Sequence, residues 1–125
     1  PEPQMAALER LLAGIMGRWG IMPARVIGHS DMAPERKGDP GQRFDWRRLA
    51  VQGLSVWPQA GGADPDDFAA AARRFGYACA DDALLLAAFR LRFRPWATGP
   101  LDALDAGMAV DLARRFAVDA GRAQA

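Results

Sequence analysis

One histidine and a carboxylate ten residues further on are the side chains of this sequence best suited to metal chemistry. They are His29 and Asp39, and Lys37 lies between them. Imidazole nitrogens and carboxylate oxygens are both common zinc ligands, and a loop of this length can return the two to one metal ion. A histidine with a nearby aspartate is more often a hydrogen-bonded structural pair, so the spacing alone leaves both interpretations open.

These residues belong to a segment, residues 28–41, that is rich in glycine, proline and charge. That composition is typical of a structured loop and not of a regular helix or strand. We expect Asp31 to cap or brace this loop and not to contact a substrate. Asp39 precedes Pro40 and Gly41, and Asp-Pro-Gly is a good turn sequence, so a structural role in the turn is the alternative to metal binding there.

A helix and a short β-prone run precede the loop and must position its start. Apolar residues spaced by three and four predict one apolar stripe on a helix that ends before Pro23. The stripe consists of Met5, Leu8, Leu12, Ile15 and Trp19. Residues 25–27, Arg-Val-Ile, form a short β-prone run that is long enough for a buried strand if neighbouring strands exist. After the loop, Asp45 is expected to cap a short helix over residues 46–52.

Three further helices are predicted in the second half of the chain, beyond a turn-rich stretch at residues 57–62. Aspartates that can cap a helix start, and a glycine or proline that ends it, mark their limits. The helices are bounded by Asp64 and Gly76, by Asp81 or Asp82 and Pro95, and, at the start of the third, by Asp102. Three helices of this size can close a small core. We therefore predict two domains, residues 1–62 and 63–125.

Composition and charge limit the partners of the chain. Its 125 residues carry a formal net charge of +1, which gives no strong field to recruit nucleic acid or an anionic membrane. No apolar run approaches the roughly 20 residues of a membrane span. Arginines at positions 73–74, 90, 92 and 94 are offset by nearby aspartates, and we predict that they form a solvated charged face. Cys79 is the single cysteine, so an intrachain disulfide is impossible.

The run from His29 through Pro40-Gly41 to Phe44-Asp45-Trp46 resembles the zinc loop of the type 2 N-acetylmuramoyl-L-alanine amidases, whose fold the peptidoglycan recognition proteins share. The likeness covers roughly residues 5–60, and the three C-terminal helices resemble, less specifically, the small peptidoglycan-binding domain that many of these amidases carry. The resemblance implies hydrolysis of the amide between the lactyl group of N-acetylmuramic acid and the L-alanine of the stem peptide.

The resemblance also implies roles for single residues. His29 corresponds to the family's second zinc histidine, Asp39 to its zinc aspartate, and Lys37 to the lysine that stabilises the oxyanion or handles a proton. Zinc held by three protein ligands keeps one position for water, lowers the pKa of that water to near 7 and polarises the scissile carbonyl. A cation beside the metal then stabilises the tetrahedral intermediate.

The chain departs from the family in one respect. The family site uses two histidines and one aspartate, whereas this chain contains a single histidine. The other histidine and the general-base glutamate belong on an upstream strand, and the start at Pro1 resembles the middle of a longer chain. We therefore expect the chain alone to be inactive and its partner to be the missing N-terminal half of the enzyme. An exposed core face left by absent strands would favour homo-oligomers.

The expected fold is mostly α, as the trailing part of an α/β mixed-sheet zinc amidase domain (zinc loop 28–46) plus a small three-helix domain. The alternative function is a non-catalytic peptidoglycan-binding module. Partners are peptidoglycan or muropeptides, which leaves polymeric murein and recycled muropeptides both open as the substrate. The expected location is the bacterial cell envelope, in the periplasm, with the cytoplasm as the alternative.

Overall fold

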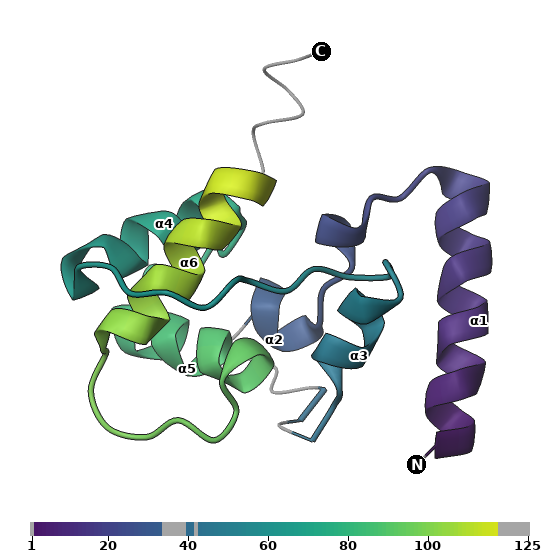
Figure 1. The fold of residues 1–125 in the computed structure, drawn as a ribbon, viewed down its shortest axis with the longest axis horizontal. Helices are drawn as coiled ribbons and strands as arrows, with labels where there is room; N and C mark the ends of the chain where they lie inside the picture. Colours follow the sequence, from purple (N-terminus) through teal and green to yellow (C-terminus); the bar gives the residue numbers. More distant parts are fainter. Residues whose placement is uncertain (1, 34–39, 42, 118–125) are drawn as a thin grey trace. The chain divides into compact units, whose positions relative to one another are not determined.

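The computed structural model describes residues 2–33, 40–41 and 43–117, and every regular element among them is helical (Figure 1). The prediction of a mostly α chain is confirmed. In order, the elements are α1 (Glu2–Trp19), η1 (Pro23–Arg25), α2 (His29–Met32), α3 (Trp46–Val51), η2 (Pro65–Asp67), α4 (Phe68–Phe75), α5 (Asp82–Phe93) and α6 (Ala103–Phe116), where η marks a 3-10 helix.

Residues 25–27 do not form a strand. Arg25 closes the 3-10 turn η1, and the part of the chain that the structure describes contains no strand. A β-prone run needs a second strand for its ladder hydrogen bonds, and none is present among these residues. The Ser55 hydroxyl instead donates a hydrogen bond of 3.3 Å to the Val26 carbonyl.

The chain forms two compact units. The first unit comprises residues 1–27 and Asp45–Trp57, and the second comprises Gly28–Phe44 with Pro58–Ala125. His29 and the described residues that follow it, up to Ala33, are thus grouped with the C-terminal helices. None of the helices in the described residues has the length and apolar character that a membrane crossing requires.

In the first unit, α1 is amphipathic, as its sequence predicts, and Met16 is its buried residue. The predicted stripe is half-buried over its first four members, but its last member, Trp19, is 72% exposed. Gly20 adopts a positive φ of 65° directly after it and ends the helix. Arg48 of α3 forms ion pairs with Glu2 and Glu9 of α1. The hydrogen bonds that Arg48 donates in these pairs lower the pKa of Glu2 and of Glu9.

The short helix α3 begins as its sequence predicts. The Asp45 carboxylate accepts a hydrogen bond of 2.9 Å from the Arg48 amide, which satisfies one free donor of the first turn. Trp46 and Leu49 are 5% and 1% exposed. Trp46 is therefore a core residue and not an exposed stacking platform for a sugar.

In the second unit, α4, α5 and α6 enclose an aromatic and aliphatic core. Phe89 of α5 packs edge-on against Phe68 of α4, with ring centres 5.1 Å apart, and its ring centre lies 4.9 Å from that of Phe93. The predicted helix starts are confirmed, because Asp64, Asp81 and Asp102 all accept hydrogen bonds from the first turns that follow them. Gly76 and Arg94 then form the C-caps of α4 and α5.

The arginines of α5 are not a solvated face, and that prediction is wrong. Arg90 is 8% exposed and forms a forked pair with the fully buried Asp105 of α6, at 2.7 Å in its closest contact. Arg90 also donates to the Gly99 and Pro100 carbonyls, and Arg94 bridges Asp102 and Asp105. Arg90 and Arg94 are four positions apart, so their side chains lie on the same side and reach the carboxylates at the start of α6. A count of charges along the sequence does not reveal these contacts.

Candidate metal loop

The structure places His29 at the first position of α2, directly after Gly28. Only the backbone of His29 is described, while Lys37 and Asp39 lie outside the described residues. Their convergence on one point therefore stays a prediction. What the structure does define is how the chain around His29 is held.

Asp31 fixes the backbone on both sides of His29. Its carboxylate Oδ2 accepts a hydrogen bond of 2.9 Å from the Gly28 amide. Its own amide donates a hydrogen bond of 3.1 Å to the Gly28 carbonyl. The two bonds close a tight turn that contains the backbone of His29. The prediction that Asp31 caps or braces the loop is confirmed.

The same carboxylate reaches the C-terminal helices. The Tyr77 hydroxyl, just beyond α4, donates to Asp31 Oδ1, and Arg92 of α5 donates to Oδ2 at 3.2 Å. The side chains of Arg92 and Asp31 are 1% and 5% exposed, so this ion pair is little screened by water. Burial, followed by the negative charge of Asp31, raises the pKa of Tyr77 well above its ordinary value.

Arg92 is held from the apolar side as well. Its guanidinium carbon lies 4.8 Å from the centre of the Phe93 ring and 5.8 Å from that of Phe75. A desolvated guanidinium over aromatic faces gains cation–π attraction. Ser30 and Ala33 are 5% and 4% exposed, and Met32 is 62% exposed. The segment around α2 is therefore a packed part of the second unit.

Sequence reasoning identified Asp31 but missed its partners. Tyr77 and Arg92 are separated from it by 46 and 61 positions. No local pattern pairs residues at such separations. The one available signal was the occurrence of an arginine at the end of an otherwise apolar helix face, where an internal carboxylate is needed to compensate the charge.

The chemistry of the donor set fits zinc in part. One imidazole and one carboxylate, the groups that His29 and Asp39 carry, are two of the three protein ligands that a hydrolytic zinc site needs. Among the described residues no group of three His, Cys, Asp or Glu side chains could hold a metal. Cys79 does not complete the set, since it is buried and its thiol bonds the Asp81 carbonyl at 3.4 Å.

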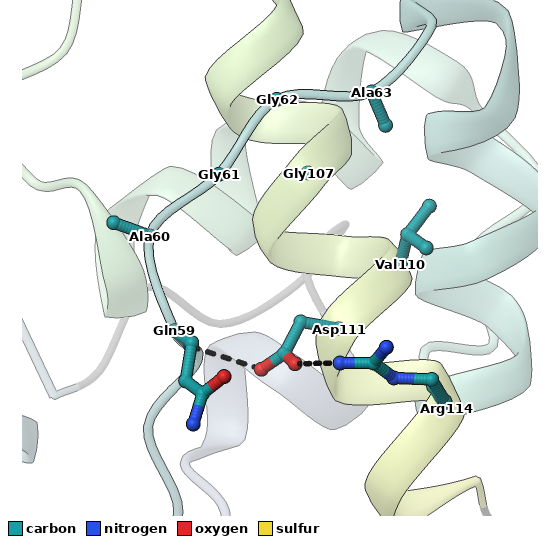
Figure 2. A pocket seen from close by; sticks show the side chains of 9 residues that line it. All are labelled: Gln59, Ala60, Gly61, Gly62, Ala63, Gly107, Val110, Asp111 and Arg114. Carbon is teal, nitrogen blue, oxygen red and sulfur yellow. Dashed lines mark hydrogen bonds and ion pairs between the residues drawn. The ribbon is translucent and has the colours of Figure 1, made fainter.

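A separate pocket of about 200 Å³ lies where residues 59–63 pass over α6. Figure 2 shows this segment crossing the helix beside Gly107. The Gln59 amide donates to Asp111 Oδ2 at 2.9 Å, and Asp111 also pairs with Arg114 at 2.9 Å. The remaining wall is mostly backbone and small side chains, so the pocket offers no nucleophile or metal donor set.

Residues 1–42 match the family model of the N-acetylmuramoyl-L-alanine amidases. Over 57 residues the chain is 47% identical to the N-acetylmuramoyl-L-alanine amidase AmiD of Escherichia coli, which is 46% of this chain and 21% of AmiD. Over 47 residues it is 48% identical to the 1,6-anhydro-N-acetylmuramyl-L-alanine amidase AmpD of Enterobacter cloacae, which is 35% of this chain and 25% of AmpD. The N-terminal third of the chain is thus similar to the N-acetylmuramoyl-L-alanine amidases.

Two solved structures extend the likeness beyond the metal loop. The complex of E. coli AmiD with anhydro-N-acetylmuramic acid-L-Ala-D-γ-Glu-L-Lys superposes with a TM-score of 0.80 at 31% identity, covering 90% of this chain and 52% of that one. AmpDh3 from Pseudomonas aeruginosa, in complex with anhydromuramic pentapeptide, gives 0.81 at 32%, covering 94% and 55%. Such coverage includes most of the C-terminal helices. The chain spans about a quarter or less of the curated relatives and about half of these solved chains.

Proposed function

We propose that this chain supplies part of the active site of a zinc-dependent N-acetylmuramoyl-L-alanine amidase. The observation that carries the proposal is the structural likeness to AmiD in complex with a muramyl peptide, which covers 90% of this chain at 31% identity. The substrate class is a muropeptide, and the bond cleaved is the amide between N-acetylmuramic acid and L-alanine.

Within that site, His29 and Asp39 would hold zinc, and Lys37 would stabilise the negative charge that develops on the scissile carbonyl oxygen. Bound zinc supplies a polarised carbonyl and a water of lowered pKa. Two ligands bind a metal weakly and leave it open, so the chain alone would be inactive. A second imidazole and a general base would come from residues upstream of Pro1.

The C-terminal helices are proposed as the peptidoglycan-binding part, with a boundary near residues 62–63. The relatives come from bacteria and are named for amidases of muramyl peptides. We assign the protein to the bacterial envelope on this basis, with recycling of muropeptides in the cytoplasm as the other setting. A muropeptide of either origin carries the same amide bond.

The test has two parts. First, isothermal titration of zinc into this chain should show weak binding that is lost in His29→Ala and kept in Lys37→Ala. The Lys37 variant is the matched control, because it alters the same loop without removing a ligand. Second, the chain extended by the residues encoded before Pro1 should hydrolyse an anhydromuramyl tripeptide, and chelation by EDTA should stop it.

In the extended protein, Lys37→Ala should lower kcat by about 100- to 1000-fold with zinc still bound, the usual cost of removing one donor to an oxyanion. Absence of both metal and hydrolysis in the extended protein would overturn the proposal. Binding of murein sacculi by that protein, without any cleavage, would favour the non-catalytic binding module instead.

A further inference from the structure

The second unit contains a buried cluster that joins the metal loop to two of the C-terminal helical segments. It consists of Asp31, Tyr77 and Arg92, and we call it the Asp31 cluster. Asp31 lies two residues after His29, Tyr77 follows α4, and Arg92 lies on α5. No part of the proposed chemistry uses these three side chains.

The contacts of Asp31 account for both of its carboxylate oxygens. Oδ1 accepts from the Tyr77 hydroxyl, and Oδ2 accepts from the Gly28 amide and from Arg92. A single atom, Asp31 Oδ2, therefore binds both the backbone immediately before His29 and a side chain of α5. Any movement of α5 relative to the loop would break a hydrogen bond on that atom.

Burial makes this connection stiff. All three residues are less than 6% exposed, at 5% for Asp31, 4% for Tyr77 and 2% for Arg92. A charged pair taken out of water is strongly penalised if one partner is removed, since the other is then left buried without compensation. Water does not reach these side chains to replace a lost hydrogen bond, so the cluster holds one geometry.

A purely structural role is the alternative, and the chain provides a comparison. Arg90 and Asp105 form another buried pair in the same unit, with 0% exposure at Asp105. That pair joins α5 to α6 and to the loop at Gly99 and Pro100. These contacts all lie within residues 90–105 and do not include the segment around His29. A role in folding alone would make the two clusters equivalent in every measurement.

We propose that the Asp31 cluster positions His29, so that α4 and α5 form a supporting wall of the metal loop in addition to any glycan-binding role. Asp31, Tyr77 and Arg92 are positioning residues and not catalytic ones, because they act through the backbone at residues 28–31. The inference rests on the proposed function only for the assignment of zinc as the ion that His29 binds.

The experiment uses the full chain, in which His29 is the only histidine and its imidazole gives a single set of NMR signals. Tyr77→Phe removes one hydroxyl and keeps the ring, and Asp31→Asn keeps the shape of the carboxylate. Asp105→Asn is the matched control in the other buried cluster. Amide hydrogen exchange is followed at Gly28 and Asp31, with the amides of α6 as the reference.

In Tyr77→Phe and Asp31→Asn, exchange at Gly28 and Asp31 should accelerate by about ten- to a hundredfold, the range expected for loss of one buried hydrogen bond to a charged group. The α6 amides should stay as in the unaltered chain. Asp105→Asn should accelerate exchange in α6 and leave Gly28 and Asp31 unchanged. The His29 imidazole signals should broaden or shift only in the first two variants.

Cobalt(II) binding, read from its visible absorption, separates this inference from the proposed function. If the unaltered chain binds cobalt, Tyr77→Phe should weaken binding by about tenfold while Asp105→Asn does not. Equal affinity in the unaltered chain and Tyr77→Phe would overturn the positioning role. If no form binds cobalt, the metal site itself fails, and the exchange data still decide whether the cluster holds the loop. Unchanged exchange at Gly28 in both cluster variants would overturn the inference outright.

Discussion

Replacing Gly107 by alanine should destabilise the second unit, although alanine is the better helix former. Gly107 lies inside α6, where residues 59–63 cross the helix (Figure 2). A Cβ atom placed there would lie 2.6 Å from the Gly61 carbonyl carbon and 2.9 Å from Gly62 Cα, and closer still to the Gly61 oxygen. These are backbone atoms, so no side chain can rotate away to make room.

The change in the free energy of unfolding has three contributions, one stabilising and two destabilising. Alanine gains about 1 kcal/mol over glycine in a helix interior. Overpacking against fixed backbone costs about 1–3 kcal/mol. Moving the segment away also weakens two hydrogen bonds that hold it to α6, Ala63 N to Ala103 O at 3.0 Å and Gln59 N to Asp111 at 2.9 Å. Each such bond contributes about 1–2 kcal/mol.

The expected net loss is therefore about 2–4 kcal/mol, or a fall in Tm of roughly 10 °C or more for a unit of this size. Urea unfolding followed by circular dichroism measures it. Gly14→Ala is the control, because Gly14 lies within α1 and a Cβ atom there meets nothing within 4 Å. That variant should be unchanged or stabilised by up to about 1 kcal/mol. If Gly107→Ala is as stable as Gly14→Ala, residues 59–63 do not cross α6 at this close distance and the reasoning is refuted.

Two pH-dependent properties follow from the buried and capping groups. Tyr77 is the only tyrosine, and burial raises its pKa, so ultraviolet titration should show no ionisation near pH 10 until the chain unfolds. The folded state then retains a proton that the unfolded state loses, so stability should fall as pH rises above about 10, and a normal titration in folded protein would contradict the burial. Asp102 has a lowered pKa, chiefly through the hydrogen bond from the Asp105 amide, so its stabilising contribution is present above about pH 4 and lost as pH falls further. The Asp102→Asn variant should be less stable at neutral pH, and its free energy of unfolding should depend less on pH below about 4. An acid-unfolding profile equal to that of the unaltered chain would argue against the cap.

The helices of this protein were largely predictable from short stretches of sequence. Asp64, Asp81 and Asp102 each precede a helix start, and Gly76 ends α4, because capping depends on neighbours within one turn. The bracing role of Asp31 was predictable for the same reason, since its bond to the Gly28 amide spans three residues. The likeness to the amidases was also recognisable from the run between His29 and Trp46.

Other features depended on the tertiary structure. The strand expected at residues 25–27 requires a partner strand, and local propensity contains no information on whether one is present. Arg90 and Arg92 look solvated beside the many aspartates of the sequence, yet both are buried against carboxylates from other segments. Whether a charge is solvated or paired depends on what the folded chain brings within a few ångströms of it, and Asp31 and Arg92, 61 positions apart, become neighbours only when the helices pack.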